Sequence, residues 1–162
     1  MDLEAALRAL HNEKAAVVLV GGAAMALQGS SLVTNDIEFC YERSSQNAEQ
    51  IARAIAPHRP RLRDASTGGP FRFDAETILR GKNFKLTTDL GDIDFVAEIA
   101  GLGSYADLQR AAATMNINGI DCLVLSTSGL IKAKKAAGKP RDLYAIPELE
   151  ALEELRKKTG LD

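Results

Sequence analysis

Short apolar runs alternate with amphipathic segments along the chain, and turn-forming residues separate them. The β-branched run Val17–Val20 predicts a buried strand that ends at the pair Gly21-Gly22. A short helix over Ala23–Gln28 follows, because this segment is rich in helix formers. In the next strand Asp36 and Glu38 share one face. This βαβ-like unit sets backbone amides at a helix start beside a pair of acids at a strand start.

Further helices are predicted where apolar residues recur at helical spacing behind a capping residue. Their expected ranges are Leu3 to about Asn12, Ser44 or Ser45 to Ile55, Ala75–Arg80, Ser104 through Ala113, Ser126 or Ser128 to Gly138, and Pro147 onwards. In the last helix, Leu149, Leu152 and Leu155 are expected to face the core.

Two hairpins complete the pattern. Phe84–Thr88 alternates apolar and polar residues and turns into a strand over Asp92–Ile99. Met115–Leu125 forms the second hairpin, because Asn118-Gly119 is the preferred two-residue turn. The Gly/Pro-rich stretch Thr67–Pro70 predicts a loop. Crossovers mixed with hairpins indicate a single α/β or α+β domain over the whole chain, with a mixed twisted sheet of about five strands flanked by helices.

Composition narrows the class of protein only a little. The 162 residues are 46% hydrophobic and 26% charged, which suits one globular domain. A formal net charge of −2 gives no global attraction to nucleic acid or to anionic membranes. Cys40 and Cys122 lack metal-ligand spacing and are expected to be reduced thiols. Without a signal pattern or an apolar run of membrane-spanning length, we expect a cytoplasmic protein with no membrane association.

Acidic residues carry the candidate chemistry. Asp36 and Glu38 are roughly 7 Å apart at their Cα atoms, at a rise of about 3.3 Å per residue, so both can reach the same divalent ion. Asp92 and Asp94 repeat this spacing, and Asp94 lies deeper in its apolar run, where an unpaired acid is costly. A solvated strand face, or pairing with Arg or Lys, is the alternative interpretation of these acids.

The pair Gly21-Gly22 also has two interpretations. Backbone amides at a helix start favour phosphate, but a tight turn without a ligand needs the same residues. The segment lacks the third glycine of the dinucleotide-binding fingerprint and the Gly-Lys-Ser/Thr of a P-loop.

Taken in order, these motifs resemble the nucleotidyltransferase superfamily with the polymerase β-like fold. The resemblance is to its small prokaryotic branch related to abortive-infection and toxin-antitoxin nucleotidyltransferases. It covers nearly the whole chain and rests on Gly21-Gly22, the segment Thr34–Glu38, Asp94 in GDIDFV, and Leu130–Asp142 with Lys134, Arg141 and Asp142 at its polar positions.

The resemblance implies that a nucleoside monophosphate moves from a triphosphate such as ATP to an acceptor hydroxyl on a protein, a tRNA end or a small molecule. It implies catalytic and metal-binding roles, with two Mg²⁺ ions, for Asp36, Glu38 and Asp94. It implies nucleotide contacts for Gly21, Gly22, Ser30 and Lys134.

Two positions depart from the family pattern, since Leu32 stands where arginine is common and Glu38 where aspartate is commoner. They keep an alternative open, in which a catalytically degenerate protein of this fold acts as a binding or toxin-antitoxin partner. General nucleic-acid binding is the weakest alternative, given the 5% aromatic content. The acceptor, the base preference and the oligomeric state are not specified, and a homodimer is compatible with the short chain.

Overall fold

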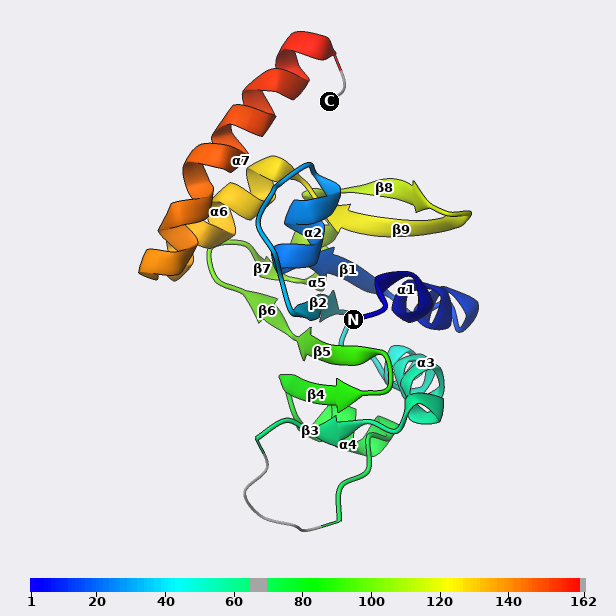
Figure 1. The fold of residues 1–162 in the computed structure, drawn as a ribbon. Helices are drawn as coiled ribbons and strands as arrows, with labels where there is room; N and C mark the ends of the chain where they lie inside the picture. The colour runs from blue at the N-terminus through cyan, green and yellow to red at the C-terminus, as the bar shows by residue number, and fades with distance from the viewer. Residues whose placement is uncertain (65–69, 161–162) are drawn as a thin grey trace.

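The computed structural model describes residues 1–64 and 70–160. A seven-stranded mixed sheet in the order β3-β4-β5-β2-β1-β9-β8 forms its centre, and helices pack against it (Figure 1). A small second sheet pairs β6 with β7. The predicted α/β architecture is confirmed, although the main sheet has seven strands rather than about five. No helix in the described ranges has the length and apolar character needed to cross a bilayer.

The strands of the main sheet are β1 (Val17–Val20), β2 (Asp36–Tyr41), β3 (Arg61–Leu62), β4 (Phe84–Thr88), β5 (Gly91–Val96), β8 (Ala112–Ile117) and β9 (Ile120–Leu125), and the small sheet holds β6 (Glu98–Ile99) and β7 (Gly103–Ser104). The helices are α1 (Leu3–Asn12), α2 (Gly21–Leu27), α3 (Ser45–Ile55), α4 (Ala75–Arg80), α5 (Tyr105–Arg110), α6 (Thr127–Ala137) and α7 (Pro140–Thr159), with a 3-10 turn η1 (Ala56–His58) after α3.

Helix starts coincide with the predicted capping residues. The side chains of Asp2, Ser44 and Asp74 each accept a hydrogen bond from a backbone N–H in the first turn of α1, α3 and α4. At the other end of α6, Gly138 adopts the left-handed conformation, with φ of 64°, that glycine accommodates best. These local signals explain why the predicted bounds of these helices agree closely with the structure.

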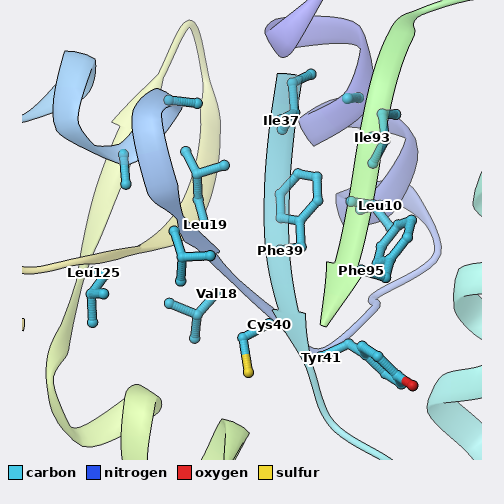
Figure 2. Close-up of a cluster of buried hydrophobic side chains, with 14 of the residues drawn as sticks. Leu10, Val18, Leu19, Ile37, Phe39, Cys40, Tyr41, Ile93, Phe95 and Leu125 are labelled. Atoms are coloured by element: carbon cyan, nitrogen blue, oxygen red, sulfur yellow. The ribbon is translucent and has the colours of Figure 1, made fainter. Parts of the chain in front are cut away.

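The apolar faces of the two central strands form the middle of the core. Figure 2 shows Ile37 and Phe39 of β2 beside Ile93 and Phe95 of β5. The rings of Phe39 and Phe95 stack with their centroids 5.7 Å apart. All four side chains are almost completely buried, so the opposite face of the same strands is left for polar residues.

The first strand pair runs antiparallel, which corrects the βαβ-like unit expected from the sequence. In β1 and β2, Val17 pairs with Tyr41 and Val20 with Glu38. A parallel crossover would carry the chain back along the whole strand. Here the seven-residue helix α2 and its loop return the chain to the end of the sheet where β1 stops, so β2 starts there. The parallel neighbours are instead β5 beside β2 and β9 beside β1.

Two segments after β4 are shorter than predicted. The strand expected over Asp92–Ile99 ends at Val96, because the amide of Ala97 donates to the Asn83 side chain and β6 then pairs with β7. The helix expected to reach Ala113 ends at Arg110, since the hairpin strand β8 already begins at Ala112 and pairs with Leu125.

The last helix begins at Pro140 instead of Pro147, which lies inside α7. Proline costs little at the first helical position, so Pro140 is the better start. Leu149 is buried as predicted, but Leu155 is 58% exposed because the second half of α7 projects beyond the sheet (Figure 1). Residues 67–69 of the predicted Gly/Pro-rich loop lie outside the described residues.

Replacing Phe95 by alanine removes a ring that contacts Phe39, Tyr41 and Phe73 in the core. We expect the free energy of unfolding, measured by urea denaturation, to fall by about 3–5 kcal/mol. The matched control is Val33→Ala at a position that is 92% exposed, which should change it by less than about 0.5 kcal/mol. A similar loss in both variants would contradict this placement of the core.

Candidate active site

Four carboxylates lie on the same face of two neighbouring strands. In the parallel pair of β2 and β5, Asp36 is in register with Asp92, and Glu38 with Asp94. Paired residues on adjacent strands point to the same side of a sheet, and residues two apart share that side. The structure therefore brings Asp36, Glu38 and Asp94 together and adds Asp92. Asp94 is the most buried of the four, as its place in the apolar run predicted.

The glycine pair lies next to this acidic face, because Val20 at the end of β1 is in register with Glu38. A Cβ atom added to Gly21 would lie 3.2 Å from Oε2 of Glu38, and the φ of Gly21 is +64°. A Cβ atom added to Gly22 would lie 2.5 Å from the Cβ of Thr34. Both positions therefore need glycine so that the start of α2 can lie close to Glu38 of β2 and to Thr34 in the loop before it. These close contacts explain the two glycines without any ligand, and phosphate binding by the pair stays a prediction.

Arg63, just after β3, pairs with two of the four acids. Its Nη2 atom donates to Oδ1 of Asp94 at 2.7 Å, and its Nε atom lies 3.2 Å from Oδ2 of Asp92. The same Nη2 atom also donates to the carbonyl oxygen of Leu86 at 2.8 Å. The interpretation that these acids pair with Arg or Lys therefore holds for β5.

Asp36 and Glu38 differ from the acids of β5. Asp36 accepts a hydrogen bond from the Thr34 hydroxyl at 3.1 Å. Within residues 1–64 and 70–160, no lysine or arginine nitrogen lies within 4.0 Å of either carboxylate. The pair on β2 is thus the part of the acidic face that has no direct cationic partner in the described chain.

The pKa values of the acids reflect how much negative charge is gathered on this face. Burial raises the pKa of Glu38, and repulsion from Asp94 and Asp36 raises it further, while the charges of Lys134 and Lys85 oppose the shift. Burial also raises the pKa of Asp94, and the hydrogen bond from Arg63 offsets only part of this effect. The carboxylates are held together at an electrostatic cost, which a bound cation would relieve.

Carboxylate oxygens are ligands that Mg²⁺ prefers, so Asp36 and Glu38 fit a divalent ion by their chemistry. The third predicted ligand, Asp94, has its Oδ1 atom engaged by Arg63. Across the part of the chain that the structure describes, no group of three or more His, Cys, Asp or Glu side chains is arranged to hold a metal ion. By their chemistry Asp36 and Glu38 could hold a divalent ion, and the site with three acids and two ions stays a prediction.

The two other predicted nucleotide contacts already have protein partners. Nζ of Lys134, on α6, lies 2.8 Å from Oδ1 of the buried Asp142 on α7. The hydroxyl of Ser30 donates to Glu148 of α7 at 2.9 Å and helps to hold the loop after α2. Lys134 still acts on the acidic face, because its charge opposes the rise in the pKa of Glu38 that burial causes.

Sequence reasoning missed Arg63 as a residue of this site. Its position in a run of basic residues after Pro60 is typical of a solvated loop. Only the pairing of β3 and β4, with Arg63 N–H donating to the Lys85 carbonyl oxygen at 2.8 Å, directs its side chain towards β5.

One cavity lies away from the acids. It has a volume of about 380 Å³ and is lined by α1, the start of β1 and β9, including His11, Val17 and Cys122. Val17 is at the opposite end of β1 from the glycine pair. This cavity does not contribute to the acidic site.

Comparison with known proteins identifies the fold. No family model and no curated protein matches the chain. Among solved structures, a Thermotoga maritima protein described as a "putative nucleotidyltransferase" matches with a TM-score of 0.51 and 19% sequence identity, over 99% of this chain and 91% of that chain. The chain therefore has a nucleotidyltransferase-like fold.

The raised pKa of Glu38 makes stability depend on pH. The carboxyl group of Glu38 has a higher pKa in the folded state than its ordinary value of 4.5, so the folded state binds this proton more tightly than the unfolded state. The free energy of unfolding therefore falls as the pH rises from 4.5 through the raised pKa. We expect Glu38→Gln to be more stable than the wild type at pH 7, and the difference to shrink as the pH falls towards 4.5. Thermal unfolding between pH 4 and pH 8 measures it.

Glu98→Gln is the matched control, since Glu98 is an exposed strand residue outside the acidic face. Its stability should follow that of the wild type across the same pH range. If the stability of Glu38→Gln also follows that of the wild type, the charge on Glu38 does not destabilise the folded state.

Proposed function

We propose that the protein is a metal-dependent nucleotidyltransferase, which moves a nucleoside monophosphate from a nucleoside triphosphate to an acceptor hydroxyl. The observation that carries the proposal is the Asp36 and Glu38 pair, which lies beside a glycine-started helix and in register with acids of β5. The nucleotidyltransferase-like fold supports the same reaction class.

In this proposal, Asp36 and Glu38 hold Mg²⁺, which would neutralise the triphosphate and fix it for in-line displacement. The acceptor oxygen forms a bond to the α-phosphorus, and the bond from that phosphorus to the bridging oxygen of the β-phosphate breaks. Pyrophosphate leaves, and the hydroxyl proton passes to a carboxylate of the acidic face. The acceptor class stays open between a protein, a tRNA end and a small molecule.

Lys134 is proposed to stabilise negative charge on the outer phosphates. Its charge already acts on Glu38, and the ion pair with Asp142 fixes it where α6 and α7 meet. Gly21-Gly22 is proposed to let the phosphates approach the backbone next to Glu38. Ser30 is proposed to contribute a hydroxyl contact, for which it would share its oxygen with Glu148.

A second candidate function has a specific observation in its favour. Arg63 engages Asp94, the acid that would complete a three-carboxylate centre. A catalytically degenerate protein of this fold, which acts as a binding or toxin-antitoxin partner, would tolerate this arrangement. Transfer of label from [α-³²P]ATP to an acceptor in lysate separates the two functions, because only the transferase produces a labelled product.

Asp36→Asn removes one carboxylate from the proposed ion-binding pair. We expect it to weaken Mg²⁺-dependent ATP binding at least about tenfold, which corresponds to about 1.4 kcal/mol. Isothermal titration calorimetry with and without Mg²⁺ measures the change.

The matched control is Asp121→Asn, which makes the same chemical change on an exposed position of β9 outside the acidic face. It should bind ATP as the wild type does. The proposal fails if wild-type protein binds no ATP at millimolar Mg²⁺, or if both variants bind it equally well.

A further inference from the structure

The backbone of Arg63 is fixed by the sheet. Its N–H donates to the carbonyl oxygen of Lys85, which extends the antiparallel pairing of β3 with β4 by one step. In turn, β4 pairs with β5 so that Lys85 is opposite Asp94. The register of three adjacent strands therefore sets the position of Arg63 relative to Asp94.

The guanidinium of Arg63 has three polar neighbours, and its hydrogen bonds come from Nη2, while the buried Nε has no hydrogen-bond partner within the described parts of the chain. It contacts the carboxylates of Asp94 and Asp92 and the carbonyl oxygen of Leu86. The side chain of Arg63 is only 20% exposed and that of Asp94 only 10%. An arginine at this depth that also binds backbone is held in place more firmly than a surface ion pair.

The position of this charge matters for ion binding. Arginine stays protonated at every pH at which the protein is folded. A divalent ion on Asp94 would lie next to a guanidinium bound to the same carboxylate, and the two positive charges would repel each other. The acids of β2 have no such competitor among the described residues.

We infer that Arg63 takes the place of one of the two ions, so that the acidic face binds a single divalent ion through Asp36 and Glu38. The inference rests on the proposed function, because it assumes that the β2 pair binds an ion. Arg63 is thus a positioning residue, which holds Asp94 and Asp92 beside the ion and offsets one of their two negative charges. While it does so, the bonded oxygen of Asp94 is unavailable as a proton acceptor.

Counting bound Mn²⁺ in the absence of nucleotide tests this inference. Electron paramagnetic resonance detects free Mn²⁺, so titration of the protein yields the number of bound ions. Wild-type protein and Arg63→Lys should bind one ion, whereas Arg63→Gln should bind two. The matched control is Arg61→Gln, which removes an exposed arginine of β3 and should leave the count at one.

A second variant keeps the test decisive if Arg63→Gln does not fold. Asp94→Asn should still bind one ion, with an affinity within about fivefold of the wild type, because only a neighbouring charge has changed. Asp36→Asn should lose that ion.

Two ions on wild-type protein, one ion on folded Arg63→Gln, or no ion on Asp94→Asn would each overturn the inference while leaving the proposed function standing. Absence of Mn²⁺ from the wild type at millimolar concentration would instead contradict the proposed function, and the inference would fall with it.

Discussion

The parallel register of β2 and β5 is the constraint on which the site depends. It serves the core first, because it stacks Phe39 on Phe95 between the sheet and its helices. The same register places Asp36 beside Asp92 and Glu38 beside Asp94 on the other face. Like charges in register repel each other, so the register that packs the core on one face brings repelling carboxylates together on the other face.

Cationic side chains offset the negative charge on β5 more directly than the charge on β2. Arg63 contacts the acids of β5 directly and offsets one of their two charges. Lys134 and Lys85 act on Glu38 only from a distance, and Lys134 makes its direct ion pair with Asp142. Glu38 is therefore left with a raised pKa between a buried strand and the start of α2. A site that binds a cation benefits from such an unmet charge, because binding then removes repulsion that folding has already introduced.

Much of this architecture follows from local patterns. Capping by Asp2 and Ser44, the Asn118-Gly119 turn and the alternation around Asp36 depend on residues within a few positions of each other. The deeper burial of Asp94 also follows from its apolar neighbours in the chain. Such features are predictable because their main energetic determinants lie in one short segment.

The features that could not be predicted depend on tertiary register. The antiparallel direction of β2 is set by where α2 returns the chain, and Arg63 meets Asp94 only because β3, β4 and β5 pair in sequence. Pro147 is likewise tolerated inside α7, where Ala145 and Leu149 pack in the core on either side of it. There, tertiary packing outweighs the local cost of proline in a helix.

The fold of this protein does not by itself determine which of its acids can bind an ion. The fold is nucleotidyltransferase-like, and within it an arginine just after the edge strand β3 pairs with the acids of β5 but not with those of β2. Because a guanidinium carries one fixed charge and no open ligand position, it can balance Asp94 but cannot polarise a phosphate as a metal ion does. Under the proposed function, the reactivity of the centre would therefore depend on whether the pairing of Arg63 with Asp94 persists when a nucleotide binds.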